Sequence, residues 1–255
     1  METQIQRSVS LMKNNIEILF RNDTLLAIQK PTGLLSVPDR FNEEKKSVSG
    51  LVLNQFESAR PLHRLDFETS GIILFCLHPD AFGWYSDQFE QRTVIKKYLA
   101  LTEGRCMERE GLIDAPLYTQ SIGKVIITKR GKSSQTKWSL LEGFQHHSFI
   151  EANPLTGRTH QIRVHLASIG LPIIADNVYG SGKPLYLSSL KGKHKYRLGK
   201  DEEEERPLMS RVALHASFIR IKDFTSGEEI TVESNLPKDL RVSLDKLRQY
   251  SALVK

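Results

Sequence analysis

The longest apolar runs in this sequence are only as long as a single β-strand. The clearest of them, residues 72–77 (IILFCL), directly follows a polar stretch that ends at Gly71. A membrane-spanning helix needs about 20 apolar residues, so none is expected. Residues 1–15 lack the apolar stretch of a signal peptide. Two cysteines are too few for a disulfide scaffold, and we therefore expect a cytoplasmic protein.

Segments with strand character dominate the chain. Strands are expected over residues 16–20, 25–30, 71–77, 94–102, 213–221 and 230–232, with strand-like alternation across 122–152. Helices are expected over residues 45–56, 78–91 and 159–169 and after Pro237, the third with Thr159 as its N-cap and Gly170 at its end. Helices and strands do not alternate strictly. The predicted fold class is therefore α+β, with a mixed, mainly antiparallel sheet and flanking helices.

Size suits one globular domain, and charge alone leaves the class of partner open. The chain has 255 residues, 39% of them hydrophobic, which fits a domain over 16–255 preceded by a flexible segment, 1–15. Its net charge of +6 fits either a plain basic protein or one that binds RNA. Residues 191–206, inside a wider charged insertion at about 183–210, hold six basic and five acidic side chains. That pattern is typical of a solvated loop, and the alternative is a basic finger that touches phosphates.

Asp66 lies in a polar segment, residues 60–71, just before the most apolar strand. A loop that a rigid strand holds in place is a common location for a catalytic residue. The same residues also suit a plain turn, because Asp followed by Thr-Ser-Gly favours bonds between side chain and backbone. Local spacing favours the turn.

A second polar group opens the helix expected over 159–169. Ile162, Leu166 and Ile169 share its core face, while His160 and Arg163 project together from another face and His165 lies away from both. His160 and His165 do not have the spacing of a zinc-binding pair and no acid accompanies them, so no metal site is expected. His160 could act as a general base or bond to the backbone. If Arg163 shares a cleft with Asp66, its charge would keep the carboxylate ionised.

These segments together resemble the RluA-like family of RNA pseudouridine synthases. Residues 63–71 (HRLDFETSG) resemble the family's segment around its catalytic aspartate, and residues 157–165 (GRTHQIRVH) resemble its second signature. Lys97-Tyr98, the opening segment 26–33 and the late segment 214–216 (LHA) also match, in family order. Lys222-Asp223-Phe224 departs from the family's late motif, with no effect expected on catalysis. Too few residues precede the first strand for the S4 RNA-binding domain that many relatives carry.

The resemblance implies a role for each matching residue. Asp66 would be the nucleophile, and Tyr98 would pack under the uracil and help remove the C5 proton. Arg163 would orient the Asp66 carboxylate and supply electrostatic stabilisation. Arg64 would fill the gap that a flipped-out uridine leaves, since a guanidinium can stack where a base was. The other substrate-binding residues would be His63, Arg158, His160, Gln161 and Leu214.

The resemblance also implies the partners and leaves alternatives. The substrate would be a stem-loop of ribosomal or transfer RNA, with no cofactor, no metal, no membrane and a monomeric enzyme. Whether Asp66 attacks the sugar or abstracts a proton from it stays open. A catalytically silent RNA-binding protein on the same fold is the first alternative. A metal-free ribonuclease that uses His63 and His160 as acid and base is the second.

Overall fold

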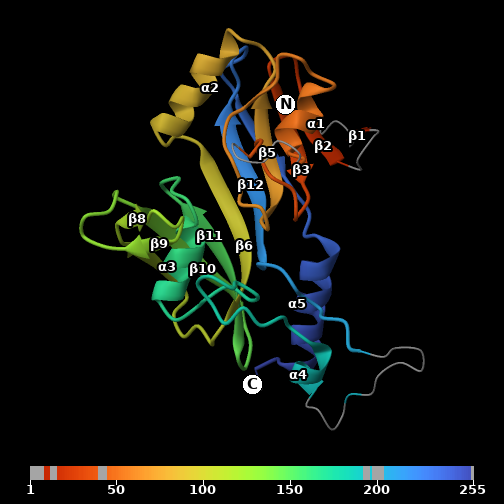
Figure 1. Ribbon diagram of the computed structural model, residues 1–255, viewed down its shortest axis with the longest axis vertical. Helices are drawn as coiled ribbons and strands as arrows, with labels where there is room; N and C mark the ends of the chain where they lie inside the picture. The colour runs from red at the N-terminus through yellow and green to blue at the C-terminus, as the bar shows by residue number, and fades with distance from the viewer. Residues whose placement is uncertain (1–8, 12–15, 40–44, 192–195, 197–203, 254–255) are drawn as a thin grey trace. The chain divides into compact units, whose positions relative to one another are not determined.

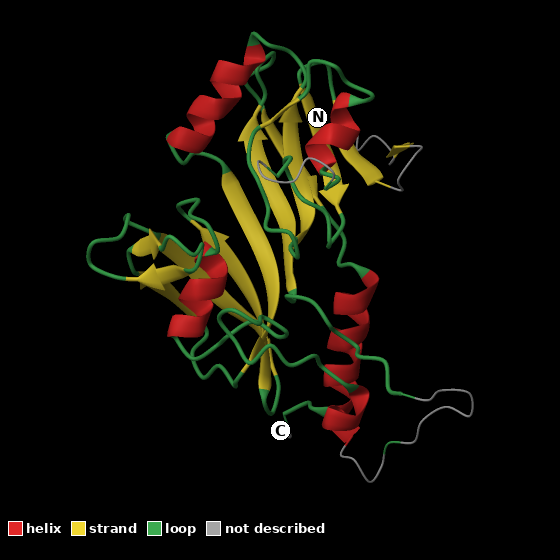
Figure 2. Cartoon of the chain, viewed as in Figure 1, coloured by secondary structure: helices red, strands yellow, loops and turns green. Residues whose placement is uncertain are grey.

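The computed structural model describes residues 9–11, 16–39, 45–191, 196 and 204–253. The chain divides into two compact units, residues 1–97 with 215–235 and residues 98–214 with 236–255. Strands outnumber helices in both (Figure 2). Within the described residues, no helix has the length and apolar character that crossing a membrane would require.

The first unit is built on a mixed sheet with strand order β1-β2-β3-β5-β12 (Figure 1). In addition, β13 pairs with β12 and β4 pairs with β5. Neighbouring strands are antiparallel except β5 and β12, which run parallel with Ser70 opposite His215. The elements of this unit are β1 (Val9–Leu11), β2 (Ile16–Arg21), β3 (Leu25–Lys30), α1 (Val48–Leu53), β4 (Arg60–Pro61), β5 (Ser70–Cys76), α2 (Ala81–Glu90), most of β12 (Leu214–Lys222) and β13 (Glu229–Glu233).

The apolar run of β5 has no polar alternation because both faces of this strand are covered. Ile72 and Leu74 point to the face that α2 covers, while Ile73 and Phe75 point to the face that α1 covers. Successive side chains of a strand alternate between the two faces, so burial on both sides requires apolar residues throughout. The loop that carries Asp66 directly precedes this rigid, doubly covered strand.

The second unit contains an antiparallel sheet with strand order β6-β11-β10-β7 and a separate hairpin, β8–β9. Its core joins the sheet to α3 through Ile162 and Leu166 and to α5 through Leu240, Leu244 and Leu247. The elements are β6 (Ile95–Glu103, whose first residues belong to the first unit), β7 (Glu110–Asp114), β8 (Leu117–Thr119), β9 (Val125–Ile127), β10 (Gln135–Gly143), β11 (His147–Pro154), α3 (Gln161–Ser168), α4 (Leu187–Lys191) and α5 (Lys238–Tyr250).

The α+β prediction is confirmed, and several boundaries differ. The first helix is shorter than residues 45–56, because Ser47 caps it by accepting the Gly50 N–H at 3.1 Å. The N-cap of α3 is His160 rather than Thr159, and Ile169 is 40% exposed rather than in the core. Residues 9–11 form β1, and the rest of the segment 1–15 lies outside the described residues, as does most of the charged segment 191–206.

Candidate active site

Asp66 lies on a tight turn between β4 and β5 in the first unit. The turn closes through its own backbone, since the C=O of Asp66 accepts the N–H of Thr69 at 3.1 Å. Leu65 before it is buried, whereas Arg64 is exposed and Asp66 half-buried. This alternation places Arg64 and Asp66 on the side of the loop away from the core. The turn interpretation and the catalytic interpretation are therefore compatible, because the turn presents the carboxylate.

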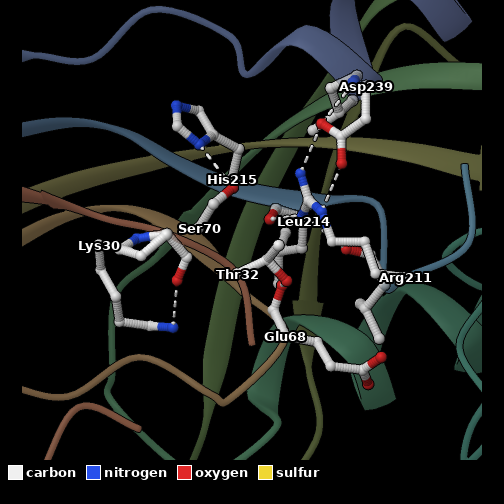
Figure 3. Close-up of polar contacts among 11 residues, drawn as sticks. Lys30, Thr32, Glu68, Ser70, Arg211, Leu214, His215 and Asp239 are labelled. Atoms are coloured by element: carbon white, nitrogen blue, oxygen red, sulfur yellow. Dashed lines mark hydrogen bonds and ion pairs between the residues drawn. The ribbon is translucent and has the colours of Figure 1, made fainter. Parts of the chain in front are cut away.

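Ser36 and Lys30 fasten this turn to the opening strand. The Ser36 hydroxyl donates to the C=O of Leu65 at 2.7 Å and accepts its N–H at 2.9 Å. Lys30, whose side chain is drawn in Figure 3, is 0% exposed. Its Nζ donates to the C=O of Phe67 at 3.1 Å and to those of Pro31 and Leu34 at 2.9 and 2.7 Å. A buried ammonium that donates to several carbonyls avoids the cost of an unsatisfied charge. Together the two side chains fix the backbone on both sides of Asp66.

Two further contacts fix the far end of the turn. The Thr32 hydroxyl donates to the C=O of Glu68 at 2.8 Å. Behind the turn, the Ser70 hydroxyl hydrogen-bonds Nδ1 of the buried His215 at 3.0 Å (Figure 3), and Nε2 of His215 lies 3.2 Å from the Ser234 hydroxyl. The turn therefore continues into a buried polar chain as well as into an apolar strand.

His63, three residues before Asp66, fixes the start of this loop against β5 and α2. Its Nε2 accepts the N–H of Leu74 at 3.1 Å, and its ring stacks on Phe89 with the centroids 5.3 Å apart. Burial, helped by the charge of Lys96, lowers the pKa of His63 to about 3. The ring is therefore neutral near pH 7.

In the second unit, Gln161 ties the loop before α3 to β10. Its Oε1 accepts from the Thr156 hydroxyl at 2.7 Å and from the N–H of Arg158 at 3.0 Å. Its Nε2 donates to the C=O of Gln135 and to the Thr136 hydroxyl. The oxygen of this buried amide thus binds the loop and its nitrogen binds β10.

Arg158 and His160 flank Gln161. The Nε of Arg158 is buried without a hydrogen-bond partner within the described part of the chain. His160 adopts a left-handed conformation, with φ of 51°, and its Nδ1 lies 2.9 Å from the Tyr179 hydroxyl. The Tyr179 hydroxyl also accepts the N–H of Val125 at 2.9 Å. His160 thus ends the loop as a rigidly held side chain at the start of α3.

Arg163 is anchored by a carboxylate that sequence reasoning missed. Its Nε and Nη2 donate to Oδ2 and Oδ1 of Asp176 at 2.7 and 2.8 Å. The guanidinium carbon lies 5.1 Å from the centroid of the Tyr179 ring. His160 and Arg163 do project together, as predicted, because both contact Tyr179. No periodic pattern marks Asp176 or Tyr179, since both follow β11 and α3 in an irregular segment.

The remaining predicted residues lie at strand positions. Tyr98 is half-buried on β6, opposite Ala152 on β11. Leu214 begins β12, is 3% exposed and belongs to the core of the second unit. His165 is buried and bonds the Thr136 hydroxyl and the C=O of Ala115, each at 2.9 Å. Its role is therefore structural, as its predicted place away from Arg163 suggests.

Comparison with known proteins identifies the family. A family model described as RNA pseudouridylate synthase matches residues 24–168. Ribosomal large subunit pseudouridine synthase D of Nitrosomonas europaea is 33% identical over 240 residues, 91% of this chain and 65% of the relative's length. Dual-specificity RNA pseudouridine synthase RluA of Escherichia coli K12 is 31% identical over 221 residues, 85% of this chain and 91% of the relative.

A solved structure agrees with these relatives. Human RNA Pseudouridylate Synthase Domain Containing 4 is 27% identical, has a TM-score of 0.67 and covers 91% of this chain and 92% of its own. The family match, the named relatives and the fold thus define an RNA-modifying isomerase with an α+β fold. The chain belongs to the RNA pseudouridine synthase family, which confirms the resemblance predicted from the motifs.

Proposed function

We propose that this enzyme isomerises specific uridines to pseudouridine in a stem-loop of ribosomal or transfer RNA, with Asp66 as the catalytic carboxylate. The N1–C1′ glycosidic bond breaks, the uracil turns, and C5 bonds to C1′. C5 then releases its proton while N1 takes one up, so that no atom is gained or lost overall. Tyr98 packs under the uracil and helps to remove the C5 proton. The catalytic domain covers residues 16–255, and the enzyme is a cytoplasmic monomer.

The observation that carries this proposal is the fixed backbone around Asp66. Ser36 binds the residue before it, and Lys30 and Thr32 bind the two residues after it. A nucleophile held in place by rigid supports loses little freedom when the substrate binds, and that lowers the barrier to reaction. Supports on both sides of Asp66 hold this carboxylate on the side of the loop away from the core, where a substrate could reach it.

The basic residues and their neighbours supply the RNA-binding part of the proposal. Arg64 is exposed beside Asp66, where a guanidinium can take the place of the flipped base. Arg158 is half-buried, and its guanidinium suits a phosphate oxygen of the substrate. His160 and Leu214 line the substrate site, whereas His63 and Gln161 shape it through their protein contacts.

The test compares Asp66→Asn with Glu68→Gln, a matched loss of one carboxylate from the same turn. The substrate is RNA from cells that lack the gene, labelled with tritium at C5 of uridine, and released tritium measures turnover. We expect Asp66→Asn to release less than about a tenth of the wild-type label, because an amide is not a nucleophile, while Glu68→Gln stays near wild type.

The alternatives give different results in the same assay. Tight RNA binding by the wild type with no tritium release would support the silent binding protein. Shortened RNA on a gel would support the ribonuclease. Retained turnover in Asp66→Asn would assign the chemistry to another residue.

A further inference from the structure

Arg163 is held on one edge by a buried ion pair. Arg163 is 5% exposed and Asp176 is 0% exposed. Nε and Nη2 form parallel hydrogen bonds of 2.7 and 2.8 Å to the two carboxylate oxygens, and Nη1 lies outside this pair. Paired bonds of this kind fix the plane and the direction of a guanidinium as well as its charge.

Asp176 is itself fixed by the chain that follows it. Its Oδ1 accepts the N–H groups of Val178 and Tyr179, each at 3.0 Å, and its C=O accepts the N–H of Gly180 at 3.0 Å. Although burial opposes ionisation, the Arg163 hydrogen bonds and charge hold the pKa of Asp176 below its usual value. The carboxylate is therefore a charged and immobile anchor.

Tyr179 restrains the same guanidinium from one face. Its ring lies 5.1 Å below the guanidinium carbon, and its hydroxyl is held by Val125 and His160. The segment 176–179 thus contacts Arg163 both at an edge and at a face. A buried ion pair contributes little net stability once its desolvation is counted. Stability alone therefore does not explain why Asp176 is paired with Arg163.

We propose that Asp176 is a positioning residue of the pseudouridine synthase reaction, which holds Arg163 so that the guanidinium edge opposite Asp176 serves the reacting centre. The inference rests on the proposed function and adds a residue to it. Asp176 acts through Arg163 and does not itself touch the RNA. Its loss therefore lowers kcat and leaves RNA binding nearly unchanged.

The test replaces Asp176 by Asn, which keeps the shape of the side chain. The amide nitrogen faces an N–H of Arg163, two donors oppose each other, and the guanidinium turns. We expect kcat to fall at least about tenfold with KM within about twofold, since one positioning contact is lost and a negative charge leaves. Asp176→Glu keeps the charge but not the geometry, and we expect it to restore less than half of kcat.

The second unit contains a matched control. Arg211 and Asp239 form the same paired ion bond, with distances of 2.8 and 3.0 Å (Figure 3), on residues given no catalytic role. Asp239→Asn breaks a pair of the same geometry in which the carboxylate side chain is 36% exposed, against 0% for Asp176. We expect it to lower the melting temperature slightly while kcat stays within about twofold of wild type.

A double-mutant cycle shows whether Asp176 acts through Arg163. In an Arg163→Lys background, Asp176→Asn should cause little further loss, because the group that it positions is already gone. Unchanged kcat in Asp176→Asn, full rescue by Asp176→Glu, or an equal kcat loss in Asp239→Asn would overturn the inference. If Asp176→Asn does not fold, Asp176→Glu and the cycle built on it decide. Absence of product from the wild type would instead overturn the proposed function.

Discussion

The backbone of Gly71 approaches that of Ala216 more closely than any side chain would allow. A Cβ on Gly71 would lie 2.2 Å from the C=O oxygen of Ala216, and the φ of Gly71 is 115°. The parallel pairing of β5 with β12 brings these residues together, one position beyond the Ser70–His215 hydrogen bond. The strand that carries the Asp66 turn therefore depends on a glycine at this position.

Gly71→Ala should destabilise the first unit by about 3 kcal/mol or more, because it adds a backbone clash to an unfavourable φ. Gly227→Ala is the control, since Gly227 has a φ of 71° but no atom within 4 Å of its Cβ position. That variant should cost about 1 kcal/mol, from the backbone conformation alone. Urea unfolding measures both, and equal losses would argue against the close approach.

The free energy of unfolding should decrease as the pH is lowered, because of His63. Its pKa of about 3 lies below the ordinary value, so the unfolded chain binds the proton more readily than the folded one. The stability that the neutral ring contributes is complete above pH ~6.5 and is lost as the pH falls towards 3, by at most about 1.4 kcal/mol per pH unit. Unfolding free energies of wild type and His63→Gln, measured between about pH 7.5 and 5, check this expectation. Parallel pH dependences would contradict it.

Tyr98→Phe should separate the two roles proposed for Tyr98. The ring remains under the uracil, so the dissociation constant for RNA should change little. Product formation should fall by about 10²-fold or stop at an adduct, because the hydroxyl that helps to remove the C5 proton is gone. Single-turnover tritium release together with RNA binding measures both roles, and equal kinetics for Phe and Tyr would leave only packing.

Arg64→Ala should slow modification of a paired uridine more than that of a uridine in an unstructured oligonucleotide. The vacated stack then stays empty, at a cost of roughly 1–3 kcal/mol by analogy with base–aromatic stacking. Arg64→Lys should rescue poorly, since an ammonium keeps the charge but does not stack as a plane. Single-turnover rates on a stem-loop and on the oligonucleotide test this. Equal losses on both, with a fully active Lys variant, would make Arg64 a simple phosphate contact.

The sequence predicts those elements whose buried positions follow from their own local pattern of apolar residues. The unbroken apolar run of β5 and the apolar spacing of Ile162 and Leu166 in α3 are local patterns, and the structure places both as expected. The His160 cap could not be predicted, because its left-handed conformation occurs together with a contact to Tyr179, far along the chain. Asp176 was missed for the same reason: its partnership with Arg163 depends on where an irregular segment folds.

The hydrogen bonds from Lys30 to the turn have a consequence for how such an enzyme can change its RNA preference. The carbonyls that Lys30 binds at Pro31, Leu34 and Phe67 belong to the main chain, and every residue type has a carbonyl. The exposed side chain of Phe67 can therefore be exchanged by mutation while the carbonyl that holds the turn stays in place. Selection can thus alter the surface beside Asp66, one residue at a time, without changing the hydrogen bonds that support the turn.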